Sequence, residues 1–297
     1  MTTVLECANP TDAKPGREPR RTVPMLWALP PLVVMIVIIV YPLLRVLSNS
    51  AEGKGNSTWL AVLTSTLFQR ALVSTAQIAV LTTIGCLALG TFIAIVLSFV
   101  PFPGSEVVGR LIDTVLALPS FLITLAFTFL YGTAGAVNAV VAGISGGARP
   151  LDFLSSPTGV ILAEITFFTP FVVRPLLAAF ATVPREQLDV AASLGASPWR
   201  VLRTVLMPEA WPALMAGGSL VLLLALNEFG IVLFTGAKDV VTLPVLIYTR
   251  GIVTFDLPGA AVIATVQVAL SLALYGLYRI IFSRMVSGRT TFHPKGA

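Results

Sequence analysis

Residues 183–208 read VPREQLDVAASLGASPWRVLRTVLMP, and very apolar segments flank this stretch on both sides. The stretch is charged, and its helical spacing predicts two short helices joined at Gly195. Glycine readily takes the left-handed conformation that ends a helix, and Ser197 followed by a proline is a typical helix start. Pro208 and Pro212 are expected to stop or kink the chain beyond. An amphipathic helix pair that projects from apolar segments is suited to contact a soluble partner.

The composition indicates an integral membrane protein. Of the 297 residues, 56% are hydrophobic and 11% are charged, whereas soluble proteins average roughly 25% charged residues. The formal net charge is +5, but the basic residues lie mostly at the termini and form no stripe interleaved with aromatic residues. We therefore expect a lipid bilayer, and no nucleic acid, as the surroundings of this chain.

Few residues are available for covalent or metal chemistry. The one histidine, His293, lies in the C-terminal tail, which excludes a serine–histidine protease and imidazole-based metal sites within the membrane. Cys7 lies in a polar tail and Cys86 in an apolar segment, so no disulfide between them is expected. We expect no catalytic residue, no metal site and no cofactor.

Six apolar runs of roughly 20 residues or more predict an all-α membrane protein with six transmembrane helices. Residues 1–24 are polar, which predicts a disordered tail before an uncleaved signal-anchor helix. A second tail is expected over 285–297, so 25–284 would form the membrane domain, with a loop over 132–157 that holds a short re-entrant or interfacial helix in one interpretation. The expected spans are Met25–Leu44, Ala71–Val100, Val108–Tyr131 with a kink at Pro119, Thr158–Ala181, Ala213–Thr235 and Gly259–Phe282.

The distribution of basic residues predicts an orientation. An even number of spans places both termini on one side, and Lys and Arg concentrate in the two tails and in residues 183–208, with Arg110 close to the turn after the second span. The opposing loops hold fewer basic residues, among them Lys54, Arg70, Arg149, Lys238 and Arg250. The positive-inside rule therefore predicts a multi-pass protein of the cell membrane in which both termini and the stretch 183–208 are cytoplasmic.

Polar residues lie inside the apolar runs, among them Glu164, Arg174, Asn227 and Glu228. Ionisable groups are costly in hydrocarbon and point to function. In one interpretation, Glu164, Asn227 and Glu228 line a path for a polar solute, and Glu228→Gln abolishes its uptake. In the other, the acids hydrogen-bond to neighbouring helices. For Arg174 we expect snorkelling to the inner headgroups.

The stretch 183–208 resembles the EAA loop of binding-protein-dependent, type I ABC importer permeases. That pattern is E-A-A, three residues, G, nine residues and I-x-L-P. Matching positions are Asp189, Val190, Ala191 and Gly195, followed by Val205, Met207 and Pro208. Aspartate replaces the glutamate and valine replaces one alanine, yet the charge and the turn are kept.

Other segments are similar to one branch of these permeases, that of the 2-aminoethylphosphonate importers. The resemblance runs from the first span to the sixth and leaves out the tails. Sulfate, molybdate, iron and polyamine permeases are kin to this branch and leave the solute open. The segments that carry the resemblance are VPFPGSE at 100–106, LPSFLITLAFTF at 118–129, GVILAEI at 159–165, PALMAGGS at 212–219, NEFGIVLFTGAK at 227–238 and TLP at 242–244.

The resemblance implies one subunit of an alternating-access importer. Its partners would be a second permease subunit, identical or related, a dimer of cytoplasmic ATPase subunits and an extracytoplasmic solute-binding protein. ATP hydrolysis would belong to the separate ATPase, so the chain itself would be no enzyme. Residues 183–208 would pass the movement of the ATPase to the flanking spans. The residues expected to do so are Asp189, Ala191, Leu194, Gly195, Trp199 and Val201.

The six residues of this segment would have different roles in passing on the movement. Asp189 would orient the first short helix or pair with a basic residue of the ATPase, and Gly195 would set the angle between the two helices. Leu194, Trp199 and Val201 would be buried in a groove of the ATPase. The alternative for Trp199, which is followed by the basic residues Arg200 and Arg203, is a place among lipid headgroups.

Two readings from other classes stay open at this point. A secondary transporter driven by an ion gradient would use Glu164 and Glu228 for proton coupling, but residues 183–208 would then have no role. An intramembrane enzyme could use Ser145 in the sequence GISG, but no histidine in any span offers it a base. A purely structural scaffold would not need the helix pair.

Overall fold

The computed structural model describes residues 29–52, 56–132, 134–145, 154, 156–237 and 240–287. Every regular element in these ranges is a helix, as expected for an all-α protein. The chain divides into two compact units, residues 1–45 and 46–297, and each is described by itself. The predicted tail at 1–24 lies outside the described residues.

Six helical stretches in the described part are long and apolar enough to cross a membrane, as the sequence predicted. One is α1 (Leu29–Glu52), whose apolar side chains from Leu29 to Leu44 lie exposed in the first unit. Exposure of so many apolar side chains suits hydrocarbon surroundings. The six stretches are Leu29–Ala51, Thr66–Phe99, Ser120–Ile144, Pro157–Ala181, Pro198–Leu226 and Leu257–Arg284.

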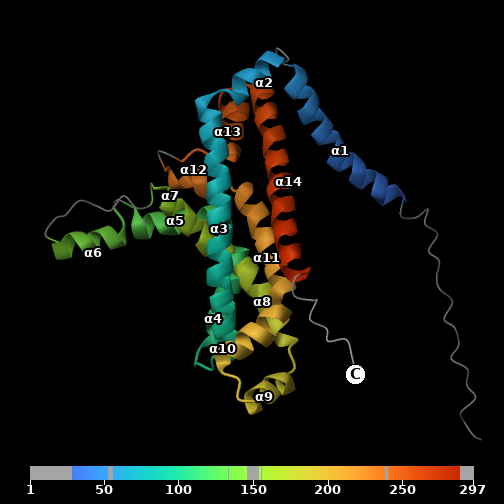
Figure 1. The fold of residues 1–297 in the computed structure, drawn as a ribbon. Coiled ribbons are helices and arrows are strands. Elements are labelled where there is room, and N and C mark those ends of the chain that lie inside the picture. The colour runs from blue at the N-terminus through green and yellow to red at the C-terminus, as the bar shows by residue number, and fades with distance from the viewer. Residues whose placement is uncertain are drawn as a thin grey trace, which may run out of the picture. The chain divides into compact units, whose positions relative to one another are not determined.

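The core of the second unit lies where three helices pack against one another (Figure 1), namely α3 (Thr66–Phe99), α8 (Pro170–Ala181) and α11 (Met207–Leu226). Val172 and Val221 have no solvent exposure there. Glycines permit the close approach, since a Cβ on Gly217 would lie 3.2 Å from the carbonyl oxygen of Phe171. α14 (Leu257–Ser287) packs against α11.

The predicted third span is wrong in its bounds. The chain forms α4 (Ser105–Ala117) and then a separate α5 (Ser120–Tyr131). Pro119 disfavours a helical residue before it, and Leu118 is extended with a ψ of 140°. α4 is amphipathic and buries no residue completely, whereas α5 and α6 (Ala136–Ser145) supply the apolar stretch.

The fifth span also differs from its predicted bounds. It starts at α10 (Pro198–Val201), continues through the π-helix η2 (Leu202–Leu206) into α11, and ends at Leu226. Pro208 and Pro212 lie inside α11 and do not stop it. Pro208 is in the first turn of α11, directly after the widened π turn, where Met207 N–H donates to the Leu202 carbonyl and a missing N–H is tolerated.

The remaining helices connect these spans. The predicted fourth span is α7 (Pro157–Phe168) followed directly by α8, and the fifth span is followed by a separate short helix, α12 (Gly230–Thr235). Between the spans lie α2 (Asn56–Leu63), α13 (Leu243–Tyr248) and the π-helix η3 (Thr249–Val253).

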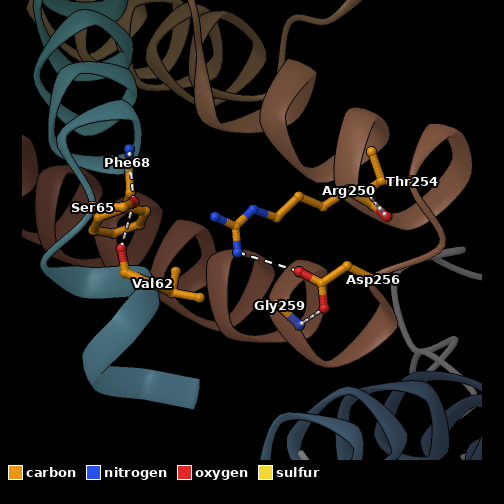
Figure 2. A network of polar contacts seen from close by, with 7 residues as sticks. All are labelled: Val62, Ser65, Phe68, Arg250, Thr254, Asp256 and Gly259. Carbon is orange, nitrogen blue, oxygen red and sulfur yellow. Dashed lines mark hydrogen bonds and ion pairs between the residues drawn. The ribbon is translucent and has the colours of Figure 1, made fainter. Parts of the chain in front are cut away.

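Polar contacts hold the turn from η3 into α14, as Figure 2 shows. Arg250 Nη1 lies 3.3 Å from Asp256 Oδ2, and Asp256 Oδ1 accepts from the Gly259 N–H at 3.0 Å. Phe255 between them has a φ of 55°, which is uncommon for a bulky residue. The ion pair between Arg250 and Asp256 therefore spans this unfavourable turn.

In the same view, Ser65 accepts from the Phe68 N–H at 3.3 Å and so caps α3.

Gly217→Leu should destabilise the protein by roughly 1–3 kcal/mol, because extra atoms at that position meet the backbone of α8. The midpoint of thermal unfolding of the purified protein in detergent measures the effect. Gly143→Leu on α6 is the matched control, since a Cβ at Gly143 meets no atom within 4 Å. Equal midpoints for the two variants would contradict close packing of α8 and α11.

Candidate functional site

Residues 183–208 form the predicted helix pair. The first helix is α9 (Arg185–Ser193), and Gly195 follows it with a φ of 75°. The Ala196 N–H donates to the Ala191 carbonyl at 3.0 Å, which closes the end of α9. Ser197 then caps α10 by accepting from the Arg200 N–H at 3.4 Å. The left-handed glycine turn and the serine cap are thus confirmed, and Figure 1 shows both helices at one end of the second unit.

Several apolar side chains of this helix pair are exposed. Leu194 is 81% exposed and Trp199 is 70% exposed. Asp189 and Gly195 are exposed as well, whereas Ala191 and Val201 are half-buried. Leu194 lies between two candidate spans and Trp199 at the very start of the fifth, and exposed apolar groups that lie close together often mark a contact with a partner or a membrane. Six residues predicted to couple thus lie on one short segment, with four of them on its surface.

The helix pair is joined to the core at both of its ends. α8 leads into α9 through Val183, which is 9% exposed, and α10 continues through η2 into α11. Half-buried Leu188 packs against the main apolar core. Asp189 lines a cavity of about 570 Å³ together with Ser98, Phe99, Leu177, Phe180, Ala181, Val183 and Leu188. The helix pair is therefore directly continuous with α8 and, through η2, with α11, which are two of the central core helices.

Glu164 lies on α7 and is fully buried. Thr82 on α3 donates to its Oε2 at 2.8 Å. Within the described part of the chain, Oε1 has no hydrogen-bond partner. A buried carboxylate oxygen without a donor is costly, so this side chain is not explained by packing alone.

Glu228 lies in the break between α11 and α12 and is 9% exposed. Its Oε1 accepts from the Ile231 N–H at 2.8 Å and from Ser120 Oγ on α5 at 3.1 Å. The carboxylate thus binds a free N–H at the start of α12 and joins this helix to α5. Asn227 is exposed and donates to the Leu223 carbonyl at 2.8 Å. The predicted interruption of the fifth span by these residues is confirmed.

Arg174 has a partner within the protein that sequence reasoning missed. Its guanidinium forms an ion pair with Asp113 on α4 and donates to the Gly109 carbonyl at 2.9 Å. The structure thus gives Arg174 a partner on α4, and the expected contact with lipid headgroups stays a prediction. Asp113 was a detectable signal, since it is a carboxylate inside a run that the sequence assigned to a span.

The family of the chain follows from comparison with known proteins. Residues 86–287 match the family of binding-protein-dependent transport system inner membrane components. The chain belongs to this family, and it is a multi-pass permease subunit of an ABC importer. It is a transport component rather than an enzyme, and the readings as an ion-driven transporter or an intramembrane enzyme are set aside.

Individual relatives indicate which permeases of this family the chain resembles most in sequence. The chain is 50% identical over 266 residues to PhnU of Salmonella typhimurium strain LT2, whose name assigns it provisionally to 2-aminoethylphosphonate transport, and the match covers 88% of this chain and 93% of PhnU. It is 27% identical to the sulfate transport system permease CysT of Synechocystis, over 92% and 94% of the two chains. The fold is that of a bacterial alginate ABC transporter solved with its periplasmic protein, with a TM-score of 0.75, 19% identity and coverage of 88% and 95%.

Proposed function

We propose that the chain is the permease subunit of an importer for 2-aminoethylphosphonate. The observation that carries this proposal is the 50% identity to PhnU over nearly the whole chain, against 27% to a sulfate permease. Half of the 266 aligned positions are identical in the two chains. At this level of sequence identity, the simplest expectation is that the two permeases carry the same small solute.

The proposed assembly has two permease subunits, two cytoplasmic ATPase subunits and an extracytoplasmic solute-binding protein. The helix pair at 183–208 faces the cytoplasm with both termini, where it contacts the ATPase. Its exposed Leu194 and Trp199 support this contact, as does the basic character of the same side of the sequence. The tails at 1–24 and 285–297 lie on that side, outside the membrane domain.

The proposed solute path runs past the breaks in the fourth and fifth spans. Glu164 lies on α7, in the part of the fourth span that the proposed orientation places in the outer half of the membrane, and Glu228 and Asn227 occupy the break after α11. Ionisable groups that are retained at such depth usually serve transport.

The experiment is uptake by proteoliposomes that hold the permease, its ATPase and the binding protein. We expect ATP-dependent accumulation of radiolabelled 2-aminoethylphosphonate, with excess unlabelled sulfate failing to compete. A control without ATP should show no accumulation. Accumulation of sulfate in place of 2-aminoethylphosphonate would refute the assigned solute and leave the permease assignment standing.

A further inference from the structure

A cavity of about 290 Å³ lies beside the break in the fifth span. Residues from three parts of the second unit meet there: the end of α11, α13 and the middle of α14. The volume is near the lower end of the range of roughly 300–1,000 Å³ for small-molecule sites, so it suits a solute of a few heavy atoms. The described residues that line it are Asn227, Phe229, Pro244, Ile247, Tyr248 and Gln267.

Gln267 supplies an acceptor that the protein leaves unused. The side chain is 5% exposed, and its Nε2 donates to the Leu226 carbonyl at 2.6 Å. Because the Leu226 carbonyl needs a donor, the amide nitrogen of Gln267 must be the atom that faces it. The amide oxygen Oε1 is then the atom that still lacks a hydrogen-bond partner. Among the described residues, no donor reaches Oε1. A buried amide oxygen without a partner calls for an explanation, which a water, an ion or a ligand donor bound at the cavity would supply.

Two aromatic rings stand at the same cavity. The centroids of Phe229 and Tyr248 are 5.0 Å apart, and the ring planes are inclined at 52°. Aromatic faces attract cations, and they do so more strongly where water is excluded. Tyr248 is 38% exposed and Asn227 is also exposed, so the cavity is open on the side of these two residues.

The local electrostatics favour a cation over an anion. The cavity adjoins the C-terminal end of α11, a helix of 20 residues, and the C-terminus of a helix carries partial negative charge. Glu228 lies between the lining residues Asn227 and Phe229 in the chain. None of the described lining residues is basic. A phosphonate or sulfate group would therefore find no basic side chain among the described lining residues.

We propose that this cavity binds the primary ammonium group of the solute, held by the rings of Phe229 and Tyr248 and by the amide oxygen of Gln267. The inference rests on the proposed function, since 2-aminoethylphosphonate carries such a group at one end. It assigns to the permease itself a selection for amines, separate from any selection by the binding protein. Solutes without an amine would pass the binding protein yet lack this contact.

The test is binding to the complete permease–ATPase complex in lipid nanodiscs, without the binding protein. Saturation-transfer NMR would compare 2-aminoethylphosphonate, ethylamine and ethylphosphonate, which lacks the amine. We expect the first two to bind and ethylphosphonate to bind at least about tenfold more weakly. Gln267→Leu should weaken binding of both amines about tenfold, and Tyr248→Leu about fivefold.

Tyr275→Leu is the matched control, because it removes a tyrosine ring of α14 that lines a different cavity, and it should bind like the wild type. Tyr248→Leu also covers the case in which Gln267→Leu does not fold, since Tyr248 lies at the surface. Equal binding of ethylphosphonate, or unchanged amine binding by both Gln267→Leu and Tyr248→Leu, would overturn the ammonium site while uptake of 2-aminoethylphosphonate stood. Gln267-dependent binding of ethylamine without uptake of 2-aminoethylphosphonate would support the site and refute the assigned solute.

Discussion

Replacing Gly195 with valine should abolish solute uptake while ATP hydrolysis by the assembled importer continues. The φ of 75° at Gly195 costs a residue with a side chain about 1–2 kcal/mol, and valine is especially unsuited to it. A Cβ there meets no atom within 4 Å, so the effect is on the backbone alone. None of the described side chains of α9 is buried, so the strain is relieved most easily by turning α9 relative to α10. Uptake and ATPase rates in the same proteoliposomes measure the uncoupling.

Two further variants distinguish an effect on the angle between α9 and α10 from the effect of backbone strain placed anywhere in the chain. Gly195→Asn should keep much of the uptake, because asparagine tolerates the left-handed conformation. Gly104→Val places the same residue at a φ of 95° in the turn before α4, also with open space around it, and should leave uptake and ATP hydrolysis coupled. Normal uptake by Gly195→Val would show that residues 183–208 do not act as a lever.

Replacing Glu228 with glutamine should abolish uptake and leave the complex assembled. The amide oxygen of glutamine can still accept from the Ile231 N–H and from Ser120 Oγ, which the carboxylate contacts at 2.8 Å and 3.1 Å. The local structure at the break therefore survives, and only the negative charge beside the proposed path is lost. The rate of solute uptake shows whether the charge is needed for transport, and size-exclusion chromatography of the permease–ATPase complex shows whether the complex assembles.

Two further variants distinguish the negative charge of Glu228 from its role as a hydrogen-bond acceptor. Glu228→Ala removes the acceptor as well as the charge, and we expect it to lower stability by roughly 1.5–3 kcal/mol. Ser120→Ala removes one donor and keeps the charge, so most of the uptake should remain. If Glu228→Gln transported solute at the wild-type rate, Glu228 would be a structural acceptor for α12 and would not belong to the path.

Much of the site could be predicted because its signals are local. The turn at Gly195 and the cap at Ser197 each depend on residues within one or two helical turns, and both are confirmed. The interruption at Asn227 and Glu228 was visible as polar residues in an apolar run. The partners of these groups were not visible, because Ser120 and Glu228 are separated by 108 positions and Thr82 and Glu164 by 82.

The class of fold, the six apolar stretches and the helix pair could be predicted from the order of the residues, because hydrophobic runs and turn residues act over short distances. The packing of the helices was needed to show that the run around Pro119 is two helices, that η2 carries the fifth span past Pro208, and that Arg174 pairs with Asp113. These outcomes depend on which helices pack together, and packing joins residues that no local pattern relates. The cavity beside Gln267 exists for the same reason, since its walls come from three separate helical regions.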